Sequence, residues 1–215
     1  MPKSPDSRAA DVPRAPQQAR GRERVAAILD ACARLILSES VDKLTMHTIA
    51  KEAGTSIGSM YHFFPDRQAV LSALGARHLA AIREVTDQML QISEPRWIAA
   101  KPAQVIDWMI MPVLRYIEAW PDFMLMISPG FAPGPLRAPL LQSEIEGIYA
   151  QVLMLRMPMQ DAVRRQRTVR TLFGLPFGLI QITLSNSEFK RELLLEEAPF
   201  ALTAYLARVE QGEAG

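Results

Sequence analysis

Residues 44–71, LTMHTIAKEAGTSIGSMYHFFPDRQAVL, decide the fold because they hold the start and stop signals of two short helices. Thr45 is a good N-cap, since its hydroxyl can accept hydrogen bonds from the exposed amides of the next turn. Gly54 stands where a helix ends in a left-handed residue, and Ser56 can cap the helix that follows. Pro65 disfavours helix at the residue before it. The two predicted helices span residues 46–53 and 57–63.

Two short helices joined by a tight turn that contains glycine have the pattern of a helix-turn-helix, whose second helix would reach base edges in the major groove. Gly58 and Ser59 are small, so they let the backbone of that helix come close to DNA. Tyr61 and His62 are expected to point outward, where a phenol and an imidazole can donate to phosphate. The apolar side chains expected to pack inward are Met60 and Phe64.

The same pattern is also compatible with a protein that does not bind DNA, because two short helices and a glycine turn occur in many other helical proteins. The alternative is a helical ligand-binding or adaptor protein whose helix-turn-helix only packs or binds protein. The charge of the surface around residues 57–62 discriminates between the two, since a neutral or acidic surface there favours the alternative.

Residues 20–71 resemble the N-terminal domain of the tetracycline-repressor (TetR) family of bacterial transcription regulators. The family's pattern is roughly T-x-x-x-I-A-x-x-A-G-V-S-x-G-x-L-Y-x-H-F-x-x-K-E-x-L. The positions that carry the resemblance are Thr45, Ile49, Ala50, Ala53, Gly54, Ser56, Gly58, Met60, Tyr61, Phe64 and Leu71. The sequence departs from the pattern at Thr55, Phe63 and Gln68, and Arg67 keeps a cation where lysine is usual.

The resemblance implies a DNA-binding surface on the two short helices and the start of the next. Phosphates would be held by Thr45, Tyr61 and Arg67. The residues near base edges or the adjacent backbone would be Ile57, Gly58, Ser59 and His62. Ile57 is apolar where polar or basic side chains are frequent, so it could contact a thymine methyl group. Extra electrostatic attraction would come from Arg20, Arg22 and Arg24.

The larger C-terminal part is rich in methionine and aromatic residues, and methionine fills irregular space and tolerates repacking. Pockets for apolar ligands often form between the helices of a bundle. Plain core packing explains any single one of these residues, but as a group they favour a pocket for an apolar or aromatic small molecule. The residues predicted to line it are Trp108, Met111, Tyr116, Phe123, Met126, Tyr149 and Phe177.

The last two helices are predicted to form a homodimer interface. Gly174 and Gly178 share one helix face, and glycine inside a helix costs about 1 kcal/mol relative to alanine, so they suggest close helix approach. Tight packing within one chain explains them equally well. The family resemblance implies a two-fold four-helix interface and a palindromic operator. The predicted interface residues are Leu172, Phe173, Leu175, Leu179, Ile180, Phe200, Ala204 and Tyr205.

Composition and charge limit the classes of protein to which the chain can belong. The chain has 215 residues, 49% hydrophobic and 22% charged, with a formal net charge of +1, so DNA binding must come from local charge. One cysteine, Cys32, excludes an internal disulfide and indicates a reducing compartment. No signal peptide is recognisable in the first twenty residues, and the late apolar run over residues 172–184 is too short to span a bilayer. We therefore expect a cytoplasmic protein.

Helical periodicity is frequent and strand signals are weak, so the predicted fold class is all-α, with about nine helices. The predicted domains are a disordered N-terminal arm over residues 1–19, a three-helix DNA-binding domain over residues 20–66, and a ligand-binding and dimerisation bundle over residues 67–215. The remaining predicted helices span residues 21–38, 67–91, 103–119, 123–127, 140–157, 160–185 and 189–211, with a kink at Pro199.

Signals of an enzyme are missing from the sequence. His47, His62 and His78 lack the spacing of metal ligands, and no phosphate-binding loop or nucleophile elbow occurs. We expect no metal, no cofactor and no catalytic residue. The predicted function is a dimeric, ligand-responsive transcriptional regulator that binds double-stranded DNA. Its most favoured form is a repressor released from a palindromic operator by an apolar or aromatic small molecule.

Overall fold

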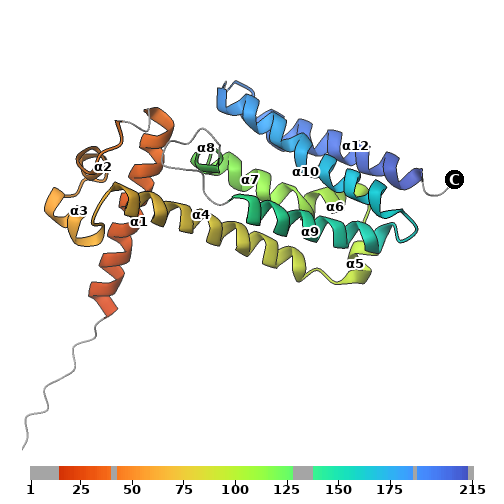
Figure 1. Cartoon of the computed structure of the whole chain (residues 1–215), viewed down its shortest axis with the longest axis horizontal. Coiled ribbons are helices and arrows are strands. Elements are labelled where there is room, and N and C mark those ends of the chain that lie inside the picture. Colours follow the sequence, from red (N-terminus) through yellow and green to blue (C-terminus); the bar gives the residue numbers. More distant parts are fainter. Residues whose placement is uncertain (1–14, 40–42, 128–137, 186–187, 213–215) are drawn as a thin grey trace, which may run out of the picture.

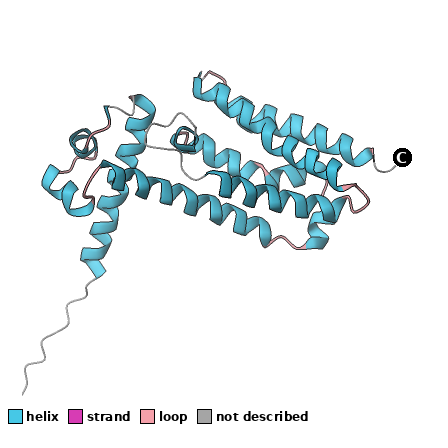
Figure 2. Ribbon diagram, viewed as in Figure 1, coloured by secondary structure: helices cyan, strands magenta, loops and turns pink. Residues whose placement is uncertain are grey.

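The computed structural model of the chain describes residues 15–39, 43–127, 138–185 and 188–212. The predicted all-α class is confirmed, since these ranges consist of helices, turns and loops and contain no strand (Figure 2). None of the helices in these ranges is long and apolar enough to cross a membrane.

The N-terminal part holds four helices: α1 (Ala15–Ser38), α2 (Met46–Glu52), α3 (Ile57–Phe63) and α4 (Arg67–Leu90). Their order and approximate bounds follow the predicted helices. α1 begins earlier than predicted, so residues 15–19, part of the arm predicted to be disordered, are helical. Alanine and glutamine favour helix, which explains the extension. The rest of that arm, residues 1–14, lies outside the described ranges.

The C-terminal part is a bundle of helices, and its first members are short. They are α5 (Glu94–Ala99), α6 (Pro102–Met109), α7 (Met111–Ala119) and α8 (Asp122–Ile127). Longer helices follow: α9 (Ala138–Arg156), α10 (Ala162–Ser185), the single turn α11 (Lys190–Glu192), the π-helical turn η2 (Leu193–Glu197) and α12 (Ala198–Gln211).

Proline explains where the bundle departs from the predicted helices. The helix predicted over residues 103–119 is divided at Ile110, because Pro112 in the first turn of α7 has no amide to continue the hydrogen-bond ladder. The π-helical turn η2 lies just before Pro199, which sits in the first turn of α12, so the last helix is irregular near its predicted kink. Pro176 is accommodated inside α10.

Two apolar cores organise the chain. The N-terminal core joins α1–α4 through fully buried side chains such as Ile28, Ile49 and Met60. The bundle core joins α4 and the C-terminal helices through residues such as Met109, Leu153 and Leu202. Figure 1 shows α4 leaving the N-terminal helices and running along the bundle, with α10 and α12 packed against each other. Because α4 serves both cores, the predicted division after residue 66 stays a proposal.

Replacing Gly54 by alanine is expected to destabilise the chain by about 1–2 kcal/mol, because Gly54 has a φ of 63° that an L side chain rarely adopts. Space is not the obstacle, since a Cβ there would meet no atom within 4 Å. The measurement is the urea midpoint of unfolding. The control is Gly58→Ala, where a Cβ also has open space but the glycine has no positive φ. Equal midpoints for the two variants would contradict the argument.

Candidate DNA-binding and effector sites

The turn between α2 and α3 is built by local caps, as the sequence predicts. Thr45 Oγ1 accepts from the Thr48 amide at 3.1 Å, and Thr48 Oγ1 accepts from the Thr45 amide at 2.9 Å, which forms a capping box. Ser56 Oγ accepts from the Ser59 amide at 3.1 Å and starts α3. Asp66 likewise caps α4. These caps fix the residues at which the three helices begin.

The third helix has one buried side and one exposed side. Met60 is fully buried and Phe64 is 7% exposed, so the two apolar residues anchor α3 in the N-terminal core, as predicted. Ile57 and Tyr61 are 38% and 54% exposed, although both are large and apolar or aromatic. The residues of α3 that were predicted to read DNA are exposed or half-buried: Ile57, Gly58, Ser59, Tyr61 and His62.

Basic side chains lie beside this exposed side. Arg24 of α1 donates from Nη1 to Ser59 Oγ at 3.3 Å, which brings the basic start of α1 to α3. Arg67 is half-buried and donates from Nη1 to the Leu44 carbonyl at 3.2 Å, so it ties the start of α4 to the start of α2. Lys51 is exposed at the end of α2. The surface around α3 is therefore basic at several points.

The residues predicted to line one effector pocket belong to separate groups. Trp108 packs edge-on against Trp97 with ring centroids 5.6 Å apart, and Arg96 lies over its ring. Met126 is buried in the N-terminal core and not in the bundle, because α8 reaches that core with its last turn. Phe177 is 39% exposed on α10. The periodicity of the sequence predicted burial but not which helices meet.

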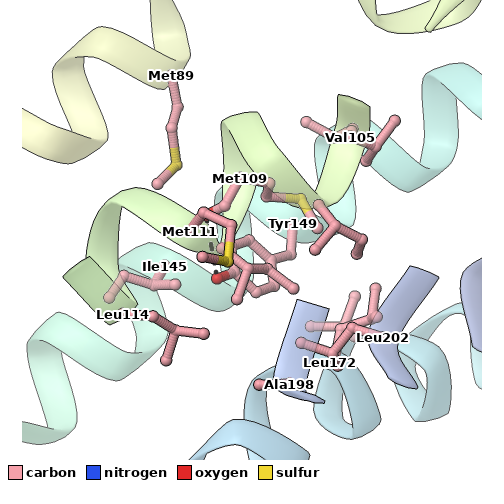
Figure 3. Close-up of a cluster of buried hydrophobic side chains, with 14 of the residues drawn as sticks. Met89, Val105, Met109, Met111, Leu114, Ile145, Tyr149, Leu172, Ala198 and Leu202 are labelled. Atoms are coloured by element: carbon pink, nitrogen blue, oxygen red, sulfur yellow. Dashed lines mark hydrogen bonds between the residues drawn. The ribbon is translucent and has the colours of Figure 1, made fainter. Parts of the chain in front are cut away.

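The middle of the bundle keeps two of the predicted pocket residues, Met111 and Tyr149, together. Tyr149 is 3% exposed, and its hydroxyl donates to the Met109 carbonyl at 3.3 Å. Burial raises the pKa of Tyr149 well above its usual value. Figure 3 shows Tyr149 surrounded by methionine and aliphatic side chains from several helices. These neighbours include Met109, Met111, Leu114, Ile145, Leu172 and Leu202.

The other two predicted pocket residues, Tyr116 and Phe123, lie against a buried histidine, His78, whose sequence spacing indicates no metal site. His78 is fully buried; its Nδ1 lies 2.6 Å from the Tyr116 hydroxyl and its Nε2 lies 2.8 Å from Asp122 Oδ2. Burial, followed by the negative charge of Asp122, raises the pKa of Tyr116 to about 12. Asp122 lies 44 residues after His78 in the sequence, so no local signal points to this cluster.

The predicted dimer residues divide by exposure. Leu172 and Ile180 are buried in the core of their own chain, at 0% and 3% exposure. Phe173, Leu179 and Tyr205 are half-buried. The exposed members are Leu175 (49%), Phe200 (74%) and Ala204.

A surface groove runs beside these residues on α9 and α10. Its volume is about 460 Å³, and its lining joins apolar to charged groups. Gly174 and Gly178 of α10 are exposed, and a Cβ at either would meet no atom within 4 Å, so the internal packing of the chain does not explain these glycines. The groove is lined by Gln142, Glu146, Arg170, Phe173, Gly174 and Phe177.

Comparison with solved structures gives similar folds. A TetR-family transcriptional regulator from Streptomyces coelicolor is 24% identical with a TM-score of 0.52, over 88% of this chain and 99% of that one. A TetR-family regulator from Haemophilus influenzae Rd (HI0893) is 16% identical with a TM-score of 0.55, over 86% and 97%. The fatty acid degradation regulator FadR from Bacillus halodurans is 15% identical with a TM-score of 0.50, over 89% and 95%. These likenesses show a shared fold.

Comparison of sequences locates the family in the N-terminal part. No curated protein matches the chain. Residues 28–74, from within α1 to within α4, match the model of the bacterial regulatory proteins of the tetR family. This match covers both helices of the helix-turn-helix and the residues of their caps. Residues 28–74 thus match the family model of the tetR regulatory proteins, and the chain as a whole shares the fold of solved TetR-family transcriptional regulators.

Proposed function

We propose that the chain is a dimeric transcriptional repressor that binds a palindromic DNA operator and is released from it by an apolar or aromatic small molecule. The observation that carries the proposal is the exposed side of α3, where small and outward-facing residues stand on a helix anchored by Met60 and Phe64. A helix inserted in a major groove contacts the base edges through the side chains of its exposed side, and small residues there let its backbone come close.

The DNA contacts that we propose follow from the position of each side chain. Ile57, Gly58, Ser59 and His62 face the groove floor or the adjacent backbone. Tyr61 donates to a phosphate, and Thr45 and Arg67 do so from the starts of α2 and α4. The basic side chains around α3, such as Arg24, favour DNA over the adaptor alternative, since a polyanion is attracted by local positive charge. A regulatory role in the cytoplasm, without catalysis, is part of the proposal.

The proposed effector site is the middle of the bundle around Tyr149. The side chains packed there include Met109 and Met111, which are flexible and can repack around a ligand. The Tyr149 hydroxyl can orient such a ligand by exchanging its hydrogen bond to the Met109 carbonyl for one to the ligand. An apolar or aromatic molecule fits among these apolar side chains better than a charged one.

The proposed dimer uses the exposed apolar residues of α10 and α12, with Leu175, Phe177 and Phe200 at its centre. Gly174 and Gly178 allow a helix of the second copy to approach α10 closely, because their Cβ positions face open space. A two-fold dimer presents two α3 helices, which suits a palindromic operator.

The test of DNA binding is a gel shift of the full chain with the DNA upstream of its own gene. We expect a salt-sensitive, sequence-selective complex, because phosphate contacts release counterions and base contacts select a site. A random duplex of equal length is the control. Equal affinity for both duplexes at physiological salt, or no complex with either, would reject the proposal.

Replacing Tyr61 by phenylalanine is expected to weaken binding to all DNA sequences by about tenfold, because one hydrogen bond to a charged phosphate is lost. The salt dependence should stay unchanged, since no charge is removed. Tyr61 is 54% exposed, so folding is unaffected. Titrations of the operator and of a random duplex at two salt concentrations measure both effects. A change confined to one base pair of the operator would place Tyr61 at a base instead.

A further inference from the structure

A layer of polar side chains separates the two apolar cores of the chain. Its centre is His78, which lies 2.8 Å from Asp122 Oδ2 and 2.6 Å from the Tyr116 hydroxyl. His78 and Asp122 are 0% and 1% exposed. At the edge of the layer, Arg77 forms an ion pair with Asp30 of α1 and lies over the Trp120 ring, 4.9 Å from its centroid.

The layer coincides with the place where α4 passes from one core to the other. Leu71 and Leu74 belong to the N-terminal core, whereas Ile82 and Met89 belong to the bundle core. His78 stands between these pairs on the buried side of the helix. α4 is thus held by apolar contacts at both ends of this stretch and by hydrogen bonds in the middle.

Helix α8 also contributes side chains to both apolar cores. Phe123 and Met124 pack in the bundle core, and Met126 packs in the N-terminal core. Asp122, at the start of α8, is the residue that bonds to His78. Tyr116 adds a contact from α7, so the ring of His78 joins three helices.

Both ring nitrogens of His78 have partners in this arrangement. In the tautomer that carries its proton on Nε2, the ring donates to Asp122 and accepts from Tyr116. Apolar packing is not directional and tolerates small rotations, whereas a fully paired buried polar cluster fits one geometry. Buried polar groups of this kind add little stability compared with apolar residues of similar size. Their contribution is therefore to favour one arrangement of the helices over others.

We infer that His78, Asp122 and Tyr116 are positioning residues for DNA recognition: together they fix the direction in which α4 carries the helix-turn-helix away from the bundle. This inference rests on the proposed function for its consequence, because the direction of α4 sets the distance between the two α3 helices of a dimer. The geometry itself can be tested without DNA.

The first test measures the geometry in the full chain. Spin labels are placed at the exposed positions of Lys51→Cys in α2 and Met159→Cys before α10, and labelled chains are diluted with unlabelled chains. Cys32 is buried with its pKa raised to about 12, mainly by that burial, so it does not react with the label. We expect a narrow distance distribution in the wild type.

The variant for this test replaces the whole cluster with apolar residues: His78→Leu, Tyr116→Phe and Asp122→Leu together. We expect a broader distance distribution with little loss of thermal stability, because exchanging a complete buried polar cluster for apolar groups is often neutral. The control is Thr86→Val, which removes a buried hydrogen bond to the Arg83 carbonyl on the same helix outside the cluster. If the triple variant does not fold, Tyr116→Phe alone should broaden the distribution to a smaller extent.

The second test reads the consequence on DNA. An operator is selected from random duplexes with the wild-type chain, and versions with one base pair added or removed at its centre are compared. We expect the triple variant to lose about tenfold of the wild-type preference for the selected spacing, a typical coupling between two sites. The Thr86→Val variant should keep that preference.

The outcomes separate this inference from the proposed function. An unchanged distance distribution in the folded variants overturns the positioning role, whatever the DNA result. A broader distribution with unchanged spacing preference also overturns it, since the direction of α4 would not matter for recognition. If the wild type selects no DNA, the proposed function fails, while a broader distribution still supports the role of His78 in fixing α4.

Discussion

Replacing Gly58 by leucine is expected to reduce operator affinity by at least about thirtyfold while the free chain becomes no less stable. Gly58 lies in the first turn of α3, and within the described residues a Cβ there would meet no atom outside its own helix turn within 4 Å. Leucine is a better helix former than glycine by up to about 1 kcal/mol, so folding should improve slightly. On DNA the new side chain occupies the space between backbone and bases, and losing even two base contacts costs about 2–6 kcal/mol.

The prediction distinguishes two effects of opposite sign: weaker operator binding and equal or greater stability of the free chain. Operator affinity is measured by fluorescence anisotropy and stability by urea unfolding. Gly147→Leu is the matched control, because Gly147 is an exposed helical glycine of α9 whose Cβ position is equally open. It should gain stability and keep its DNA affinity. Unchanged operator affinity in Gly58→Leu would mean that α3 does not enter the groove.

The helix-turn-helix could be predicted from sequence because its signals are local. Thr45 and Ser56 cap their helices with atoms three residues away, and Gly54 adopts its left-handed conformation within one turn. Such features act through short-range geometry, which a single sequence records directly. The exposure of Ile57 and Tyr61 does not follow from helical spacing, since both lie within one turn of the buried Met60, and it depends on how α3 packs on the N-terminal core.

The effector region could not be predicted to the same depth because its contacts are long-range. Periodicity identifies Tyr116 and Met126 as inward residues, but one faces His78 and the other faces the N-terminal core. The pairing of His78 with Asp122 joins residues far apart in the sequence and has no local signature. Leu172 illustrates a further limit, since an apolar face of α10 serves either the chain's own core or a second copy.

Replacing Phe200 by aspartate is expected to convert the proposed dimer into a monomer, raising the dissociation constant by at least about a hundredfold. Phe200 is 74% exposed at the start of α12, a helix that packs against α10. Aromatic residues at the centre of an interface commonly contribute 2 kcal/mol or more, and a buried unpaired carboxylate adds a desolvation penalty. In a single chain the aspartate would stay in water, so the fold should persist.

Sedimentation equilibrium over a range of concentrations measures the association of wild type and variant. The control is Met159→Asp, which places the same charge at a residue that is 90% exposed but lies in the turn before α10. It should leave the dimer intact. The melting temperature offers an independent readout, because a dimer that unfolds to monomers melts at higher temperature as its concentration rises. This dependence should vanish in Phe200→Asp, and a variant that sediments as the wild type would show that copies of the chain meet through another face.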